Sequence, residues 1–370
     1  MSLNIAIVGA GNAACVTAMY YHVHGRLVNN IVNKITIYYD PKIPIERVGQ
    51  GSVVPITKLI SKCFDINWHV DTNIIKATPK TGILYENWGI LDKLFHPFQL
   101  SNISLHYVPQ LLSKLIIESG MFEVVEKNVV DIEKEIDADY IFDCRGKPED
   151  YSEYDDLINP INSVILSRKE GRDLELTYTR CVATPHGWTF VIPNHDSVSY
   201  GYLYNDKITL REIAEENFID LFDVVPDGHL KFKNYIAKDI WRGERTILNG
   251  NRLCFLEPLE ATSVGFYQTV CSSVLKTITQ GVSKEITNQD VRNEMQEIQN
   301  FILWHYQTGS KYDTPFWDYA KSLRFDEDKK FNRFLDISRK HNYDKLRFAL
   351  GDEYGQWSYI NFKNWDELTV

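Results

Sequence analysis

The sequence predicts an α/β protein with a Rossmann-like core near its N-terminal end, and three neighbouring segments support this prediction. Asn4 to Val8 is a continuous apolar run that ends at a glycine, which is typical of a central parallel strand covered on both faces. Helical periodicity follows from Asn12 to Tyr21, with Gly25 able to end the helix, and Lys34 to Asp40 predicts the next strand. Together these segments predict a βαβ unit.

Later segments predict more strands and a long helix. Asp139 to Gly146 is another apolar run that stops at glycine, whereas Thr177 to Thr184 and Trp188 to Ile192 predict antiparallel strands of a separate sheet. Val291 to Tyr306 predicts an amphipathic helix, because apolar residues recur there at helical spacing. No repeat, low-complexity tract or Pro/Gly linker separates these segments, so we expect residues 1–370 to form one interwoven unit.

Composition excludes several classes of partner. The 370 residues carry 40 Lys and Arg against 50 Asp and Glu, a net charge of −10, without a local basic patch. We therefore expect neither nucleic acid nor an acidic membrane as partner. The chain opens directly on the first strand and holds no uncharged run of membrane-spanning length, so we expect a cytoplasmic protein. Its six cysteines form no C-x-x-C pair and are expected to be reduced, and we predict no metal ion.

The turn after the first strand has the pattern of a dinucleotide site. Gly9 permits the tight turn, Gly11 lets the backbone approach a pyrophosphate, and Ala14 takes the third position, where glycine is usual. The start of the following helix offers free N–H groups to phosphate, and Asp40 at the end of the second strand could hold the ribose hydroxyls. The remaining predicted cofactor contacts in the turn are Asn12 and Ala13. The alternative is a glycine-rich turn without a ligand.

The position of this turn favours FAD over NAD. It lies at the N-terminal end, and the strand from Asp139 to Gly146 returns to it later in the chain, as in flavoproteins of this class. A second nucleotide fingerprint is missing from the sequence. We therefore expect reduced FAD to arrive from a separate flavin reductase rather than to be made on this chain.

Six motifs, in order over residues 1 to about 320, resemble the flavin-dependent halogenases, the two-component type related to tryptophan halogenases. They are Arg47 to Pro55, Pro79 to Trp88, Asp139 to Gly146, Thr177 to Pro193, Phe255 to Ser263, and His305 to Trp317. The resemblance implies a glutathione-reductase-type FAD-binding core at about 1–60, 100–155 and 245–290. It implies a substrate-binding region of antiparallel sheet and helices at about 65–100, 160–240 and 291–370.

The resemblance also implies the chemistry and its residues. Reduced FAD, oxygen and a halide (chloride, bromide or iodide) would give hypohalous acid, which Lys80 would deliver to an aromatic carbon while Glu260 assists. Read alone, Lys80 would be a solvated loop lysine, Lys76 is a nearby decoy, and Glu257 fits a helix-start carboxylate. Backbone N–H groups of Thr262 and Ser263 would bind halide, and the flavin loop would include Gly49 and Ser52.

The same resemblance implies a pocket for a flat, electron-rich ring. Its expected residues are His96, Phe98, Tyr306, Tyr312, Phe316 and Trp317. Tyr312 stands where tryptophan-specific members carry a Glu that grips the substrate ammonium. We therefore expect an indole, a phenol or another small aromatic substrate, and not free tryptophan.

Departures from the family pattern keep rival interpretations open. Phe190 replaces a second tryptophan, which leaves room for an aromatic hydroxylase, and Gly250 to Cys254 reads as a shortened version of the segment under the FAD phosphates. That shortening motivates a third hypothesis, a flavin-fold binding protein without turnover. The trimmed substrate region predicts an open pocket. Residues 320–370 would either cap that pocket or form a subunit contact, as in a homo-oligomer.

Overall fold

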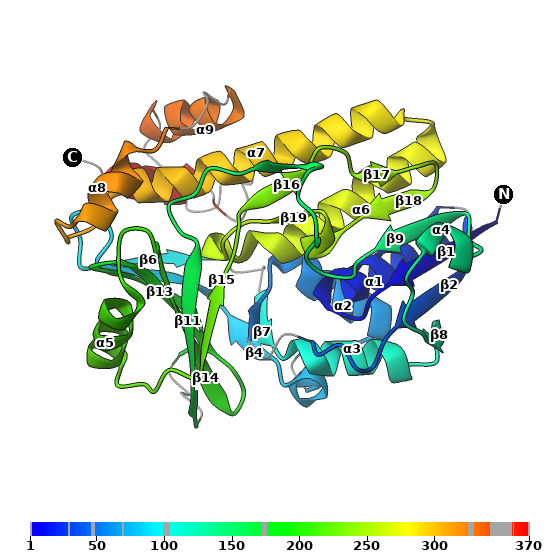
Figure 1. Ribbon diagram of the computed structural model, residues 1–370, viewed down its shortest axis with the longest axis horizontal. Helices are drawn as coiled ribbons and strands as arrows, with labels where there is room; N and C mark the ends of the chain where they lie inside the picture. Colours follow the sequence, from blue (N-terminus) through cyan, green and yellow to red (C-terminus); the bar gives the residue numbers. More distant parts are fainter. Residues whose placement is uncertain are drawn as a thin grey trace. The chain divides into compact units, whose positions relative to one another are not determined.

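The computed structural model describes residues 2–28, 30–45, 49–68, 70–98, 104–171, 176–324, 329–340, 357 and 359–368 (Figure 1). The chain forms two compact units, each assembled from three separated segments. Unit 1 comprises Met1–Ala77, Tyr107–Asp156 and Tyr235–Met295, and unit 2 comprises Thr78–His106, Leu157–Asn234 and Gln296–Val370. The mixed α/β class agrees with the prediction. The assignment of cofactor and substrate to particular segments stays a prediction.

Unit 1 is built on a parallel sheet around β1. Its described strands, in spatial order, are β17 (Trp241–Arg242), β18 (Thr246–Leu248), β9 (Tyr140–Asp143), β1 (Leu3–Val8), β2 (Val32–Tyr39) and β8 (Glu123–Glu126). β1 pairs in parallel with β2 on one side and with β9 on the other, as the apolar run predicted. A small antiparallel sheet in the same unit contains β10 (Tyr154–Asp156), β16 (Tyr235–Ala237) and β19 (Cys254–Phe255).

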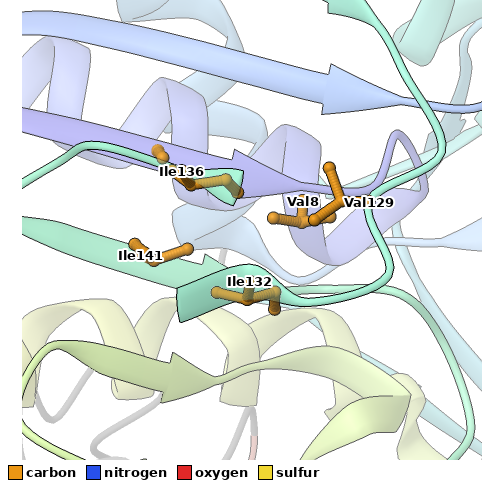
Figure 2. Close-up of a cluster of buried hydrophobic side chains, with 6 residues drawn as sticks. Val8, Val129, Ile132, Ile136 and Ile141 are labelled. Carbon is orange, nitrogen blue, oxygen red and sulfur yellow. The ribbon is translucent and has the colours of Figure 1, made fainter. Parts of the chain in front are cut away.

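Apolar side chains from β1 and β9 pack against the loop that leads into β9. Figure 2 shows Val8 and Ile141 from the sheet beside Val129, Ile132 and Ile136. All five are buried. Burying a side chain of this size stabilises the fold by roughly 1.5–3 kcal/mol, so this cluster helps to fix the carboxyl ends of β1 and β9 beside each other.

The helices of unit 1 surround that sheet. They are α1 (Asn12–Leu27), α2 (Val54–Phe64), η1 (Thr72–Ile75), α3 (Pro109–Glu118), α4 (Ile132–Glu135), η2 (Gly250–Arg252), η3 (Leu259–Ala261) and α6 (Thr262–Gln280), and the short strand β3 (Gln50–Gly51) precedes α2. The prediction that Gly25 ends the first helix is wrong, because α1 continues to Leu27. A Cβ at Gly25 would lie 2.5 Å from Val32 Cγ2, so glycine is needed there for close approach to β2.

Unit 2 contains a larger, mainly antiparallel sheet. Its described strands are β15 (Gly228–Lys231), β11 (Ser163–Glu170), β14 (Ser197–Tyr204), β13 (Gly187–Pro193), β12 (Thr179–Thr184), β5 (Gly82–Glu86) and β6 (Lys93–Pro97). The pairing of β12 with β13 confirms the predicted antiparallel strands. Phe190 on β13 lies over Gly201 on β14, where a Cβ would come within 2.1 Å of its ring. A separate ribbon joins β4 (Thr78–Lys80) to β7 (Ser104–Tyr107).

Helices complete unit 2. They are α5 (Arg211–Phe222), α8 (Pro315–Ser322), α9 (Lys329–Lys340) and α10 (Tyr359–Asp366), and α7 (Lys284–Thr308) runs from unit 1 into unit 2. The predicted amphipathic helix is confirmed, and Val291, Met295 and Ile302 are among its buried positions. Within the described residues, no helix has both the length and the apolar character needed to cross a membrane.

An ion pair ties β12 to the neighbouring β5 in unit 2. The Nε and Nη2 atoms of Arg180 donate to the two carboxylate oxygens of Glu86 at 2.8 and 2.9 Å. The side chains are 29% and 11% exposed, so both charges are largely removed from water. Such a bidentate pair has defined geometry, and losing one partner leaves the other charge uncompensated.

We expect Arg180→Gln to lower the free energy of unfolding by about 2–3 kcal/mol, because Glu86 would keep a desolvated charge without its partner. Urea denaturation measures this. The control is Lys114→Gln, which removes a pair to Glu118 whose side chains are 64% and 63% exposed, and it should change stability little. Equal effects of the two substitutions would contradict the assignment of Arg180 as a structural partner of Glu86.

Candidate functional site

The turn after β1 has the geometry of a phosphate cradle. Gly9 has φ +127°, and a Cβ there would lie 2.6 Å from the carbonyl oxygen of Cys144, so only glycine fits without strain. A Cβ at Gly11 would meet no atom within 4 Å. The turn is therefore tight beneath Gly9 and open above Gly11, which leaves room for a ligand to approach the backbone.

The start of α1 suits an anion. Its N-cap residue, Gly11, has no side chain to cap the first N–H groups, and the first turn of the helix contains no acidic residue. These N–H groups and the helix dipole therefore remain available to phosphate. Ala13 and Ala14 are buried, which lets α1 pack closely below the turn. The residues present thus fit the pyrophosphate of a flavin dinucleotide.

The predicted ribose ligand lies at the same end of the sheet. Val8 is paired with Tyr38 in the β1–β2 ladder, and the N–H of Gly9 donates to the Tyr38 carbonyl at 2.8 Å. Asp40 follows two residues later at the carboxyl end of β2, partly exposed, and its carboxylate accepts from the N–H of Lys42 at 2.9 Å. The strand therefore places Asp40 at the edge of the sheet where the ribose hydroxyls were predicted to bind.

Asn12 links the turn to the predicted flavin loop. Its amide donates to Gln50 Oε1 at 3.1 Å and accepts from the hydroxyl of Tyr107 at 3.0 Å. Close by in sequence, Ser52 is buried and shares a 3.1 Å hydrogen bond with Thr57 Oγ1. Gln50 and Tyr107 were not predicted as site residues. Gly49 is half-buried beside β3, and Arg47 lies outside the described residues.

The segment that the sequence suggested was shortened does pack under the turn. Gly250 has φ +66°, and a Cβ there would lie 2.4 Å from the Cβ of Ala13. Asn249 donates from its side-chain amide to the Thr17 hydroxyl at 3.0 Å, which fastens the same segment to α1. The segment is short, as expected, and it nevertheless packs against α1. The sequence did not reveal the contact with α1, because Gly250 and η2 make it within only a few residues.

Two arginines that sequence reasoning missed flank this region. Arg145 binds both carboxylate oxygens of Asp143 at 2.9 and 2.8 Å, and Arg252 Nε donates to the same carboxylate at 3.2 Å. Asp143 is buried, and although burial raises its pKa, the two guanidinium groups outweigh that effect and hold the pKa below its ordinary value. One carboxylate thus faces two cations at the carboxyl end of β9.

The residues before α6 have unusual backbone geometry. Glu260 and Ala261 have φ of +68° and +53°, a left-handed conformation that is costly for residues other than glycine. Glu260 is nevertheless buried, and Glu257 in the same loop is fully buried. Placing Glu260 just before the helix therefore costs conformational energy. Such strain commonly marks a functional position.

The predicted halide residues begin α6. Thr262 and Ser263 are the first residues of this helix, whose N-cap provides no side-chain hydrogen bond and whose first turn contains no acidic residue. Their N–H groups can therefore bind an anion. A Cβ at Gly265 would lie 3.2 Å from Val53 Cγ2, so the start of α6 lies against Val53 in the predicted flavin loop.

Lys80 is buried at the end of β4 in unit 2. It is 1% exposed, is paired with Ser104 across the β4–β7 ribbon, and its Nζ lies 5.4 Å from the centre of the Phe98 ring. Lys76 is partly exposed and belongs to unit 1. A lysine is rarely fully buried unless its charge is paired. This burial distinguishes Lys80 from an ordinary loop lysine.

His106 occupies the same face of the ribbon, because Thr78 pairs with it and Thr78 and Lys80 are two residues apart on β4. Thr78 donates its hydroxyl to the Pro193 carbonyl at 2.8 Å, so it can only accept from His106 Nδ1, 3.4 Å away. Nε2 is then left to accept from Thr179 at 2.8 Å. Burial and the nearby charge of Lys80 lower the pKa of His106 well below its ordinary value, so its ring is neutral.

His96 lies in an aromatic cluster of unit 2. It is 2% exposed, and its ring centroid is 4.3 Å from that of Trp357, 5.1 Å from Tyr85 and 5.8 Å from Trp365. Burial and the neighbouring His305 lower the pKa of His96 well below its ordinary value. Neither ring nitrogen of His96 has a hydrogen-bond partner among the described residues. The expected open pocket is therefore not found around His96.

The other predicted pocket residues form a neighbouring group. Tyr306 packs near Phe316 and Trp317, with ring centroids 6.4 and 6.1 Å away. Trp317 is fully buried and donates from Nε1 to the Thr184 carbonyl at 2.8 Å. Tyr312 is partly buried beside Lys311, and desolvation raises the pKa of its hydroxyl. Trp88 links this group to the cluster around His96, because its ring centroid lies 5.8 Å from that of Tyr306 and 5.9 Å from that of Trp365. The predicted sandwich of a substrate ring stays a prediction.

Comparison with known proteins gives one consistent result. A family model described as tryptophan halogenase matches residues 4–115 and 117–360. Tryptophan 7-halogenase RebH of Lentzea aerocolonigenes is 22% identical over 292 residues, which cover 71% of this chain and 50% of RebH. The chain thus spans only about half the length of this curated relative.

Two solved structures have a similar fold. The flavin-dependent halogenase BrvH of Brevundimonas sp. BAL3 matches with a TM-score of 0.77 and 16% identity, over 98% of this chain and 89% of BrvH. The tryptophan 6-halogenase SttH of Streptomyces toxytricini matches with a TM-score of 0.75 and 18% identity, over 99% and 90% of the two chains. At these identities the likeness establishes the fold, including its Rossmann-like core.

The Gly250 contact gives a matched pair of substitutions. Gly250→Ala should lower the melting temperature and weaken FAD binding at least tenfold, because its Cβ would push α1 away from the turn. Gly120→Ala is the control, since Gly120 has a similar φ of +69° but open space around a Cβ. Thermal denaturation and FAD fluorescence titration measure both effects. Equal losses in both variants would show that backbone strain alone, and not contact with Ala13, explains the result.

Buried neutral histidines predict acid sensitivity. Because the folded-state pKa values of His96 and His106 are lowered, the unfolded chain takes up these protons first as pH falls below about 6.5. The free energy of unfolding should be constant above that pH. Below it, the free energy should fall by about 1.4 kcal/mol per pH unit for each histidine. Urea unfolding between about pH 8 and about pH 5 tests this. His106→Gln should reduce this dependence of stability on pH by the contribution of one histidine. An unchanged dependence on pH would contradict a neutral His106 in the folded protein.

Proposed function

Because this chain belongs to the tryptophan halogenase family, we propose that it halogenates a small electron-rich arene with reduced FAD, oxygen and halide. The observation that carries the proposal is the burial of Lys80, a lysine on the motif that resembles the family's active-site segment. The cradle at Gly9 and Gly11 and the helix start at Thr262 supply matching sites for a dinucleotide and an anion.

The overall reaction balances in two stages. Reduced FAD, oxygen, a halide ion and one proton give oxidised FAD, hypohalous acid and water, which is the chemistry that the flavin supplies when bound. An aromatic C–H and hypohalous acid then give a carbon–halogen bond and water. The protein must hold the acid between these stages, because hypohalous acid in free solution would attack other groups.

Lys80 is the group that we propose holds the oxidised halogen. A buried ammonium can donate a hydrogen bond to the oxygen of hypohalous acid and polarise its oxygen–halogen bond, and an amine can instead take the halogen as a haloamine. The neutral His106 supports this role, because a second positive charge on the same face of the β4–β7 ribbon would repel the Lys80 ammonium.

Glu260 is proposed as the carboxylate that assists. A carboxylate can accept the proton that the ring loses when the cationic intermediate collapses, which restores aromaticity. Its strained, buried position two residues before Thr262 supports a role in chemistry over a role as an ordinary helix cap.

The substrate is proposed to be an indole or phenol without an amino-acid head group. Tyr312 lacks the carboxylate that would pair with a substrate ammonium, and the unpartnered nitrogens of His96 favour a ring that carries an N–H or O–H group. A separate flavin reductase is the proposed source of reduced FAD. An aromatic hydroxylase is less well supported, because direct oxygen transfer would leave both buried groups, Lys80 and Glu260, without a role.

The test compares two lysines. With reduced FAD supplied by an unrelated reductase, plus bromide and a panel of indoles and phenols, mass spectrometry should find brominated products. Lys80→Gln should lower the yield at least a hundredfold, because an amide carries no charge and forms no comparable haloamine. Lys76→Gln, in the partly exposed neighbour, should leave it unchanged.

Each alternative gives a different product pattern. Oxygenated products without halogen would favour the hydroxylase. Flavin binding without any product, across all halides, would favour the binding protein. Equal bromination by Lys80→Gln and the unmodified chain would show that free hypobromous acid is the reagent and would overturn the role of Lys80.

A further inference from the structure

Two arginines share one buried carboxylate at the carboxyl end of β9. Arg145 alone covers both oxygens of Asp143, through Nε at 2.9 Å and Nη2 at 2.8 Å. Arg252 Nε donates a third hydrogen bond to the same carboxylate at 3.2 Å. A bidentate pair is already a complete partner for a carboxylate. Neutralising Asp143 therefore does not explain why Arg252 lies there.

The three side chains carry one positive charge in excess. The two arginine side chains are 25% and 22% exposed, and the carboxylate is 5% exposed. Two other carboxylates act on Arg145. Glu135 is already paired with Lys127, and Glu149 is exposed to water, where its charge is screened. A charge that is largely withdrawn from water is costly unless an anion balances it, so the cluster indicates a place for an anionic ligand.

Arg252 is the arginine that has donors left for such a ligand. Its Nη1 donates to the Lys147 carbonyl at 3.3 Å, and its Nη2 makes no hydrogen bond within the part of the chain that the structure describes. A guanidinium carries five N–H groups in a fixed fork, so it can hold Asp143 through Nε and a second anion through the other nitrogens. Arg145 differs, because its Nη1 also donates to two backbone carbonyls.

The backbone that carries Arg252 is fixed beside the phosphate cradle. The N–H of Asn249 donates to the Asp143 carbonyl at 3.1 Å, so η2 begins next to the end of β9. The carbonyl of Arg252 accepts from the Tyr154 hydroxyl at 2.8 Å. Gly250 lies between these two contacts, and it is the residue that packs under the start of α1. The arginine thus belongs to the hydrogen-bonded segment that supports the cradle.

We propose that Arg252 is a further ligand of the FAD pyrophosphate and bridges it to Asp143. Val8 pairs with Asp143 in the β1–β9 ladder, so the turn after β1 opens at the same edge of the sheet. A guanidinium fork binds phosphate oxygens with defined geometry, and a pyrophosphate supplies the negative charge that the cluster lacks. The proposal rests on the proposed function for the identity of the ligand.

Fluorescence titration with FAD, without reductase or halide, tests this contact. Arg252→Gln should raise the Kd for FAD about tenfold in low salt, because it removes a charge-assisted hydrogen bond to phosphate. Raising sodium chloride from about 50 mM to about 500 mM should weaken binding more in the unmodified chain than in Arg252→Gln. The reason is that added ions screen an ion pair that only the unmodified chain has.

Two further variants separate a local contact from other effects. Lys114→Gln removes an exposed positive charge of α3 in the same unit, and it should leave the Kd for FAD unchanged. Arg252→Lys keeps the charge without the fork, so it should lose less affinity than Arg252→Gln and keep its dependence on salt. Both variants at Arg252 should fold, because Arg145 still covers Asp143, and thermal denaturation checks this.

The outcomes separate the role of Arg252 from the proposed reaction. An equal Kd for FAD in Arg252→Gln and the unmodified chain would overturn that role and leave the proposed halogenation standing. A higher Kd with an unchanged dependence on salt would indicate a structural effect and would also overturn it. If Arg252→Gln does not fold, an unchanged Kd in Arg252→Lys would overturn the bridge. Weaker, less salt-dependent FAD binding in Arg252→Gln, without halogenated product from the unmodified chain, would support the ligand and reject the halogenation.

Discussion

The candidate site of unit 1 depends on one constraint, the parallel register of three strands. Val8 of β1 pairs with Asp143 of β9, and Asp143 pairs with Leu248 of β18, so all three strands end at the same level. Because parallel strands place their following loops at one edge, the residues after each strand meet there. Gly9 contacts Cys144, and Gly250 contacts Ala13. Loss of this register would separate the parts of the predicted phosphate cradle.

Unit 2 buries polar groups among aromatic rings, and these groups differ in whether they have hydrogen-bond partners. His106 is neutral because burial and the nearby charge of Lys80 lower its pKa, and two threonine hydroxyls specify its tautomer. His96 is neutral because burial and His305 oppose its protonation, and its nitrogens stay unpaired within the described residues. The first arrangement pairs both ring nitrogens of a histidine, whereas the second leaves both without a partner among the described residues.

Sequence patterns predicted those elements whose conformation is determined by neighbouring residues. The apolar run of β1, the glycine turn and the amphipathic part of α7 were recognisable because strand burial, positive φ and helical spacing leave marks in neighbouring residues. Contacts between distant residues leave no such mark. Gly25 was misread as a helix end because Val32 is a tertiary neighbour, and the support from Gly250 was invisible without α1. The contacts of Gln50, Tyr107 and Arg145 near the turn were missed for the same reason.

In the proposed reaction, the oxidised halogen stays bound to the protein near Lys80 until it meets the arene. The most direct measurement adds increasing free methionine, which consumes hypohalous acid in solution, to a reaction with reduced FAD, bromide and indole. If the claim is right, the yield of bromoindole stays constant as methionine rises in excess over indole. A yield that falls in proportion to methionine would show that the acid leaves the protein, and would contradict the account.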